Sequence, residues 1–412
     1  MNSPASKLFT LADLTPDTLA DDCNIDDLFE QFNASVSDEI DEIAALRDSG
    51  QSPIPEVTYQ QLNQSGFSAT QAALVRKRGC VVIRQTFSEQ QAENWNTQLS
   101  EYLVVNQYQE KLQQDIDAGN VARKSHPHML DIYWSKTQLE VRQSEQLHQL
   151  QQHMNGLWKV GASGAGVFDT QKSYTYSDRV RIRQPLDQMH GLAPHVDSCS
   201  MEAWFSQETV DRTYATLLNG NWKAFDAFDS VGRVNTSHKP HENSVGMFRT
   251  YQGWMALTAQ GPDSGTLQLV PSSRCVAWMF LSMLRESMRN VEQVYPLPSE
   301  AYILHPEKHA LLIKGLCSIP VLQAGDTIWW HPDAVHAVEQ SNLSNEHSSV
   351  IYLGIAPQCS RNKEYLHAQR TSFAQGSSPP DFPATNLEEN YSGRGLAEHL
   401  NQLGAQQMGL KT

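Results

Sequence analysis

The chain has 412 residues, 40% of them hydrophobic, so it can bury a large core as one elaborate domain or as roughly two to three domains. Its formal net charge of −15 argues against a broad electrostatic surface for nucleic acid. No run of about eighteen apolar residues occurs, and residues 1–19 lack an apolar signal core, so we expect neither a membrane span nor export.

The first 55 residues are acidic and are predicted to form a separate N-terminal helical segment, 1–55, with one or two partly mobile helices. Apolar side chains recur there with partial helical periodicity, as Phe29, Phe32, Ile40 and Ile43 illustrate. Aspartates and glutamates fill the positions between them. We interpret these acidic positions as a solvated helix face.

Helices also dominate the next hundred residues. A helix is expected over 57–77, and the β-branched run at 80–84 predicts a short strand. Ser88 and Gln91 have the spacing of a capping box, so a long helix should begin there and run to about residue 103. Further helices are expected at 111–117 and 138–158.

The sequence turns β-rich from residue 179. Basic and apolar side chains alternate over 179–183, which is typical of a strand with one basic face. Further strands are expected at 192–197, 245–259, 266–270, 317–323, 327–330 and 348–355. A turn at 261–265 should join 245–259 and 266–270 as a hairpin. Helices are expected at 201–219 and 275–289.

This order of elements predicts an α+β protein whose short strands form a sandwich or barrel. We expect a single main domain over 56–395, with its core strands at about 175–358 and a C-terminal tail at 396–412. None of the six cysteines forms a C-x-x-C pair, which favours reduced thiols in a cytoplasmic protein over three disulfides.

An H-x-D step at His195, Val196 and Asp197 carries the strongest chemical signal. Residues i and i+2 of a strand project from the same face, so His195 and Asp197 can reach one metal ion. His336 follows the strand 327–330 and offers a second imidazole, with His331 as the alternative. Two imidazoles and one carboxylate are the ligand set of non-haem Fe(II) oxygenases. The three-residue motif alone arises often by chance, and a surface or capped histidine is the alternative.

Longer blocks of sequence, in the same order, resemble known families. The segments Gly253-Trp254-Met255-Ala256-Leu257, Ser264-Gly265-Thr266-Leu267 and Gly325-Asp326-Thr327 resemble the pattern of phytanoyl-CoA dioxygenases. The segments Asp178-Arg179-Val180-Arg181, Pro194-His195-Val196-Asp197-Ser198, Phe248-Arg249-Thr250-Tyr251-Gln252-Gly253-Trp254 and Pro379-Pro380-Asp381-Phe382-Pro383 are similar to those of YbiU-like proteins. This second resemblance covers most of residues 55–395.

The resemblance implies a double-stranded β-helix, the cupin-like jelly roll, flanked by helices and carrying a long insertion between core strands. It also implies an Fe(II)- and 2-oxoglutarate-dependent oxygenase in which His195, Asp197 and His336 hold the iron. Such an enzyme hydroxylates or oxidises a small organic substrate with O2 and releases succinate and CO2. We expect a small-molecule substrate as partner, with no nucleic acid and no membrane.

One departure from the oxygenase pattern concerns the cation that binds the far carboxylate of 2-oxoglutarate. The last expected strand, 348–355, contains no Arg or Lys. Arg183 and Arg249 are the candidates to replace it, and Arg361 is a third. For the alternating arginines, the alternative is a solvated or acid-paired sheet face.

Trp254 is expected beside the cosubstrate, or else as a core aromatic. A cupin-like metalloenzyme that does not use 2-oxoglutarate, such as a hydrolase or isomerase, is a competing interpretation of the whole pattern. A non-catalytic metal-binding scaffold is another. The chain contains neither a G-x-S-x-G elbow nor a Walker A sequence.

Overall fold

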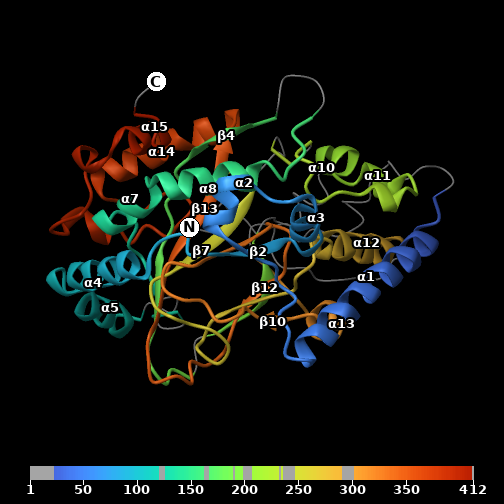
Figure 1. Ribbon diagram of the computed structural model, residues 1–412, viewed down its shortest axis with the longest axis horizontal. Coiled ribbons are helices and arrows are strands. Elements are labelled where there is room, and N and C mark those ends of the chain that lie inside the picture. The colour runs from blue at the N-terminus through green and yellow to red at the C-terminus, as the bar shows by residue number, and fades with distance from the viewer. Residues whose placement is uncertain are drawn as a thin grey trace, which may run out of the picture.

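Two β-sheets lie at the centre of the molecule, and helices gather at both ends of its long axis (Figure 1). The computed structural model describes residues 23–119, 126–161, 167–188, 191–197, 207–231, 233–234, 246–289 and 301–410. Within these residues helices and strands are mixed along the chain, which confirms the predicted α+β class.

The larger sheet holds eight strands. In spatial order seven of them are β1 (Glu56–Thr58), β2 (Cys80–Arg84), β11 (Thr327–Trp330), β7 (Tyr251–Ala256), β13 (Ser348–Gln358), β5 (Val180–Arg183) and β3 (Met129–Leu130). The eighth, β4 (Asp169–Tyr174), pairs with the far end of β13. β1 and β2 run parallel, and every other pair in this sheet is antiparallel.

The smaller sheet holds five antiparallel strands, in the order β10 (Cys317–Ser318), β8 (Leu267–Leu269), β12 (His336–Val338), β6 (Leu192–Val196) and β9 (Tyr302–Ile303). Side chains of both sheets share one buried cluster, which includes Trp254 and Ile328 of the larger sheet and Leu267 and Val338 of the smaller. The two sheets therefore pack face to face.

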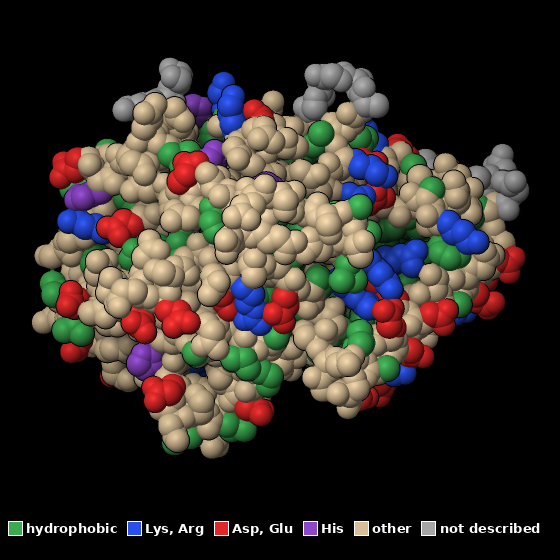
Figure 2. Space-filling view, in the orientation of Figure 1, with side chains coloured by type: hydrophobic (Ala, Val, Ile, Leu, Met, Phe, Trp, Pro, Cys, Tyr) green, Lys and Arg blue, Asp and Glu red, His purple; other side chains and the backbone are tan. Residues whose placement is uncertain are grey.

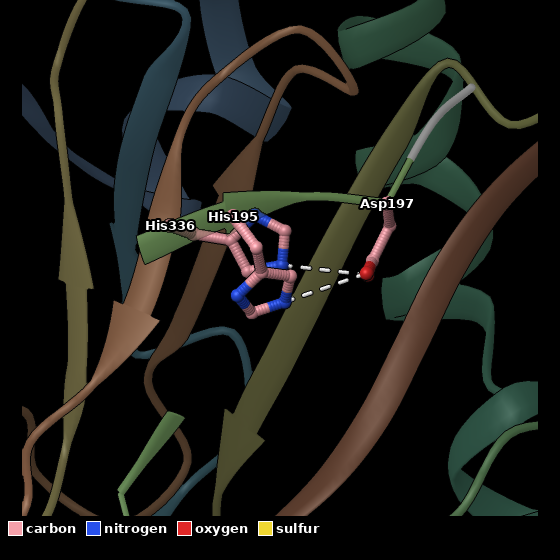
Figure 3. A group of neighbouring side chains, drawn as sticks. All are labelled: His195, Asp197 and His336. Atoms are coloured by element: carbon pink, nitrogen blue, oxygen red, sulfur yellow. Dashed lines mark ion pairs between the residues drawn. The ribbon is translucent and has the colours of Figure 1, made fainter. Parts of the chain in front are cut away.

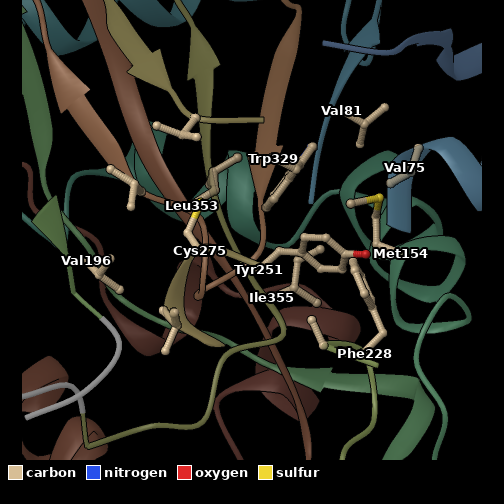
Figure 4. Close-up of a cluster of buried hydrophobic side chains, with 14 of the residues drawn as sticks. Val75, Val81, Met154, Val196, Phe228, Tyr251, Cys275, Trp329, Leu353 and Ile355 are labelled. Carbon is tan, nitrogen blue, oxygen red and sulfur yellow. The ribbon is translucent and has the colours of Figure 1, made fainter. Parts of the chain in front are cut away.

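The outer face of the larger sheet is covered by helices. Tyr251, Trp329 and Leu353 alternate with the residues that face the smaller sheet, as the strand period of two requires. They belong to a second buried cluster together with Val75 of α3 (Ala69–Arg78), Met154 of α8 (Glu145–Asn155) and Cys275 of α12 (Cys275–Met288) (Figure 4). The larger sheet is thus buried on both faces, and the cavity described below lies on its inner face.

Within its described residues, the acidic N-terminal sequence forms one long helix, α1 (Ile25–Asp48), which packs on α12 and on α13 (Ala310–Lys314). Its apolar side is fully buried, with Phe32, Val36, Ile40 and Ile43 each at 0% exposure.

The acidic side of α1 faces basic residues of neighbouring elements. Lys77 pairs with Glu42 at 2.7 Å, and Lys314 pairs with Asp41 at 2.7 Å. Figure 2 shows acidic side chains along this edge of the molecule with lysines and arginines between them. The acidic face of α1 is therefore partly paired as well as solvated.

Two predicted helices are interrupted in the structure. The segment 57–77 divides into β1, α2 (Tyr59–Ser65) and α3, because Gly66 has a left-handed φ of 67° and Ser68 opens α3 with a capping box. The segment 138–158 divides into α7 (Lys136–Arg142) and α8, whose first turn is capped by Ser144. Local capping residues override the continuous apolar periodicity in both places.

The helix predicted at 201–219 is also divided in its described part, into α10 (Gln207–Arg212) and α11 (Ala215–Leu218), with a break at 213–214. The helix predictions at 88–103, 111–117 and 275–289 are confirmed. Ser88 and Gln91 form the expected capping box at the start of α4 (Glu89–Val105), and its apolar residues Ala92, Trp95 and Leu99 are buried. The remaining helices are α5 (Tyr108–Asp117), η2 (Trp222–Ala224), α14 (Ser360–Gln375), η3 (Leu387–Asn390), η4 (Ala397–His399) and α15 (Gln402–Gln407). The first part of the helix predicted at 201–219, residues 201–206, lies outside the described residues.

The predicted hairpin between 245–259 and 266–270 is wrong. β7 pairs with β11 and β13 in the larger sheet, whereas β8 pairs with β10 and β12 in the smaller one. The turn at 261–265 therefore carries the chain from one sheet to the other. Turn residues predict where a chain reverses, but the partner of each strand depends on packing across the core.

None of the described helices has the length and apolar character that a membrane span requires. Cys80, Cys275, Cys317 and Cys359 are thiols that form no disulfide with the described residues, in line with the reduced cysteines predicted from the sequence. Cys199 lies outside the described residues.

Gly325 offers a test of the turn before β11. Its φ of +90° is left-handed, and a Cβ at this position would collide with the backbone carbonyl of Phe87. We expect Gly325→Ala to lower the free energy of unfolding by about 2–5 kcal/mol, from strain and overpacking together. Gly393 also has a left-handed φ, +76°, but open space around it. Gly393→Ala should therefore cost only about 1–2 kcal/mol in urea denaturation, and equal losses would contradict the predicted collision.

Glu388 in η3 joins the C-terminal segment to the core. It is 1% exposed, and its carboxylate accepts hydrogen bonds from Tyr102 Oη (2.7 Å), Tyr133 N (2.5 Å) and Trp134 N (3.0 Å). Burial raises its pKa to about 7 in spite of these donors.

Between the ordinary pKa of 4.5 and about 7, folded Glu388 holds a proton that the unfolded chain has lost. The free energy of unfolding should therefore fall by roughly 3 kcal/mol from this group as the pH rises through that window. Glu388→Gln removes this contribution. The difference between the two proteins, measured by urea denaturation from pH 4.5 to 8, should change by that amount, and parallel curves would contradict the prediction.

Candidate metal centre

Three side chains predicted to bind metal meet at one end of the smaller sheet. His195 lies on β6 and His336 opens β12, and the two residues are direct cross-strand partners. Their ring centroids are 4.2 Å apart, as a directly opposed pair on one face allows. Asp197 follows the end of β6, and Figure 3 shows its carboxylate pointing back at both imidazoles.

The donor atoms of this group lie at ligand-like separations. Asp197 Oδ1 is 3.4 Å from His195 Nε2, and Asp197 Oδ2 is 3.4 Å from His336 Nε2. One ligand atom from each residue lies within 4.8 Å of the other two. Within the described parts of the chain, no other group of three His, Cys, Asp or Glu residues converges in this way.

Backbone carbonyls hold both imidazoles in the orientation that a metal needs. His195 Nδ1 lies 2.7 Å from the carbonyl oxygen of Ala193, and His336 Nδ1 lies 3.3 Å from that of Ala334. Assigning the proton to Nδ1 as donor leaves the Nε2 lone pair of each ring facing Asp197. This is the arrangement in which an outer hydrogen bond fixes the tautomer of a histidine ligand.

The electrostatics of the group also suit a cation. Burial disfavours the charged form of Asp197, but the positive charge that His336 and His195 carry when protonated outweighs burial and holds the pKa of Asp197 well below its ordinary value. Burial, with the neighbouring His195, lowers the pKa of His336, whereas Asp197 outweighs burial and raises the pKa of His195. An ionised carboxylate beside a neutral imidazole is what divalent metal binding requires.

The group borders a cavity of about 200 Å³ between the two sheets. Its lining residues are Met129, Asp178, Arg179, Leu192, His195, Asp197, Arg249, Gln252, Gly253, Trp254, Leu267, Trp330, His336, Val338, Tyr352 and Leu353. Asp197 keeps 37% of its side-chain exposure. Three ligands on one side of an ion would leave its other positions open toward this space.

Of the predicted cations, Arg249 reaches the cavity. Its guanidinium lies over the ring of Tyr176, 4.8 Å from the centroid, and makes no hydrogen bond or ion pair to the described residues. Burial opposes its charge, but Tyr176 and Asp178 outweigh burial and raise its pKa. Gly354 of β13 leaves room for this side chain, because a Cβ there would lie 3.2 Å from Arg249 Cδ.

Arg183 is not brought to the cavity. It is fully buried, and its guanidinium pairs with Asp187 at 2.8 Å and donates to the carbonyls of Glu339 and Gln340. It connects the larger sheet to the end of the smaller one. Arg361 likewise donates to the carbonyl of Gly246 and is absent from the cavity lining.

Two more cavity residues bear on the prediction. Trp254 lines the cavity and is 1% exposed, with the Arg181 guanidinium 4.3 Å from its ring centroid. Arg179 also lines the cavity, although the sequence interpretation did not select it for binding. The signal was present in the alternation of arginines: Arg181 and Arg183 are buried on one face of β5, and Arg179, just before the strand, continues the same alternation.

His331 lies apart from the metal-binding group. It is fully buried and stacks on Trp158, with ring centroids 4.9 Å apart at an interplanar angle of 16°. Its Nδ1 accepts the backbone N–H of Asp333 at 3.0 Å. Burial lowers its pKa to about 4. These contacts are those of a core histidine.

Comparison with known proteins places the chain in a family. Residues 11–410 match Gig2-like proteins. The chain belongs to the Gig2-like family. YbiU of Escherichia coli K12 is a relative of this Gig2-like protein, 32% identical over 391 residues that cover 94% of the chain and 92% of YbiU. The predicted resemblance to YbiU-like proteins is therefore confirmed. The finer resemblance to phytanoyl-CoA dioxygenases finds no support in these matches and stays a prediction.

Solved structures show the same fold. A Salmonella typhimurium LT2 protein aligns with a TM-score of 0.84 at 29% identity, covering 94% of this Gig2-like chain and 93% of its own. GlcNAc Inducible Gene 2 (DUF1479) of Candida albicans aligns with a TM-score of 0.79 at 22% identity, covering 100% and 91%. The non-haem α-ketoglutarate-dependent carbocyclase SnoK aligns at a TM-score of only 0.40 and 12% identity over 85% of the chain, a likeness that decides nothing about function.

Proposed function

We propose that this Gig2-like protein is an Fe(II)- and 2-oxoglutarate-dependent oxygenase that oxidises a small organic substrate. The observation that carries the proposal is the convergence of His195, Asp197 and His336 at a cavity between two facing sheets. We interpret the sheets as a double-stranded β-helix. Two imidazoles and a carboxylate on one face of a metal are the ligand set that non-haem Fe(II) oxygenases use.

The donor set favours iron over a closed structural site. Structural zinc sites are built from four protein ligands, whereas three leave room for a cosubstrate and O2. With 2-oxoglutarate bound, iron would supply the oxidising power for cleavage of a substrate C–H bond, and the protein would supply orientation and exclusion of water. The backbone carbonyls of Ala193 and Ala334 fix the orientation of the two imidazoles for metal binding.

Arg249 is the residue that we assign to the far carboxylate of 2-oxoglutarate. It lines the cavity, is charged, and has no hydrogen-bond acceptor among the described residues. In the oxygenase pattern this cation lies on the last strand, which here is β13 and contains none. Gly354 of β13 has no side chain, and Arg249 occupies the space next to it. A guanidinium binds a carboxylate through two parallel hydrogen bonds. Trp254 lines the same cavity, and we assign it a place beside the cosubstrate.

The test is anaerobic reconstitution of the protein with Fe(II), followed by O2 and 2-oxoglutarate. We expect 2-oxoglutarate to be consumed and succinate to form in equal amounts, slowly without substrate and faster with it. Protein loaded with Zn(II) is the control and should form no succinate. Absence of succinate from the iron-loaded protein, together with metal-dependent hydrolysis or isomerisation of a metabolite, would instead support the metalloenzyme that does not use 2-oxoglutarate.

A further inference from the structure

Asp178 and Arg179 present a carboxylate and a guanidinium side by side in the cavity wall, just before β5. The Asp178 carboxylate accepts one hydrogen bond, from the Arg179 backbone N–H at 2.7 Å. The Arg179 guanidinium is 3.9 Å from that carboxylate and forms no side-chain hydrogen bond with any described residue. Both groups therefore retain hydrogen-bonding capacity toward the cavity.

The backbone beneath these two side chains is held from three directions. The carbonyl of Asp178 accepts hydrogen bonds from Gln138 Nε2 at 3.0 Å and Arg142 Nη2 at 2.5 Å. The carbonyl of Arg179 accepts the N–H of Tyr352 at 3.1 Å. A donor and an acceptor on a support this rigid have the pre-organisation expected of a binding site.

Aromatic rings lie near the pair. The Arg179 guanidinium lies 5.0 Å from the ring centroid of Phe382, which is not part of the cavity lining. Tyr352 and Trp254 do line the cavity and pack edge to face, with centroids 5.5 Å apart at 85°. These two rings offer apolar surface in the same cavity as the two polar groups, which is the usual composition of a small-molecule site.

The charges of the cavity limit what can bind there. Among its described lining residues, the two negative charges of Asp178 and Asp197 balance the two positive charges of Arg179 and Arg249. The two histidines are neutral when they bind a metal. Fe(II) and the dianion 2-oxoglutarate also cancel. A charged group added by a substrate would therefore be buried without a counter-charge, which is costly.

We propose that Asp178 and Arg179 bind an uncharged substrate that carries neighbouring hydrogen-bond donors and acceptors, such as adjacent hydroxyl groups or a hydroxyl beside an amide. This inference rests on the proposed oxygenase function. Asp178 accepts a hydrogen bond from the substrate and Arg179 donates one. Both are binding residues, and neither takes part in metal binding.

The experiment compares hydroxy acids with their primary amides, so that each pair differs in charge and hardly in shape. Glycerate, erythronate and gluconate are tested against their amides on the iron-loaded protein, with 2-oxoglutarate consumption as the readout. Calorimetry on the Zn(II)- and 2-oxoglutarate-loaded protein measures binding without turnover. We expect at least one amide to stimulate consumption and to bind about tenfold or more tightly than its acid.

Two variants connect the preference to the pair. Asp178→Asn leaves Arg179 without its compensating charge, so preference should shift toward the acid by about tenfold or more. Asp169→Asn makes the same chemical change on β4, beside Lys172 and outside the cavity lining, and should leave the preference unchanged. A shift in both variants would overturn the assignment of Asp178.

The outcomes separate the two proposals. Equal or tighter binding of every acid, or no binding of any amide, overturns the inference even if 2-oxoglutarate is consumed. Tighter amide binding in calorimetry, lost in Asp178→Asn, supports the binding role of the pair even if no succinate forms. In that second case it is the proposed oxygenase function that fails.

Discussion

Replacing His336 with alanine is expected to lower the affinity for Fe(II) by at least about 100-fold. The change removes one of three ligands, and two ligands cannot complete the face that holds the ion. It also leaves Asp197 without one of the two imidazoles that stabilise its charge. Anaerobic equilibrium dialysis against Fe(II), with bound iron measured in both proteins, gives the two dissociation constants directly.

His331→Ala is the matched control, because it removes the other histidine near β12. His331 packs on Trp158 and Phe228 in the core, so its loss should cost about 2–4 kcal/mol of stability by leaving a cavity. Iron affinity should stay within a few-fold of the parent protein. If His331→Ala abolishes iron binding and His336→Ala retains it, the ligand assignment is wrong.

The site was predictable from sequence to the extent that local geometry determines it. Spacing of two along a strand puts His195 and Asp197 on one face, and this holds in whatever sheet the strand belongs to. The choice of His336 over His331 rested on resemblance alone. Its physical reason appears only in the structure, where β12 pairs with β6 and sets His336 directly opposite His195.

The fold was less predictable where partners are distant in sequence. The turn at 261–265 was recognised, but the strands on either side of it belong to different sheets. The alternating arginines were recognised too, yet sequence could not decide whether their face was solvated or buried. In the structure this face is buried: Arg183 forms an ion pair with Asp187, and Arg179 lines the cavity. The partner of each arginine depends on contacts across the core, and local sequence patterns do not contain that information.

The two arginines selected from sequence lead to opposite expectations. Arg249→Met keeps the length and apolar character of the stem but removes the guanidinium. We expect it to raise the KM for 2-oxoglutarate by about 100-fold, because a buried carboxylate that loses a two-pronged charged partner loses on the order of 3 kcal/mol. Iron affinity should hardly change, since His195, Asp197 and His336 are untouched. Succinate formation measured against 2-oxoglutarate concentration gives the KM.

Arg183→Met is the control for that result. Its loss removes a fully buried guanidinium that pairs with the partly buried carboxylate of Asp187 and donates to the carbonyls of Glu339 and Gln340, which should cost about 3–5 kcal/mol of stability. At a temperature where the variant is still folded, the KM for 2-oxoglutarate should be unchanged; Arg183→Lys serves if the methionine variant does not fold. If the KM rises only in Arg183→Met, 2-oxoglutarate binds near Arg183, and the assignment of Arg249 to its far carboxylate is wrong. A rise in both would mean that the KM reports the packing of the two sheets and not contact with 2-oxoglutarate.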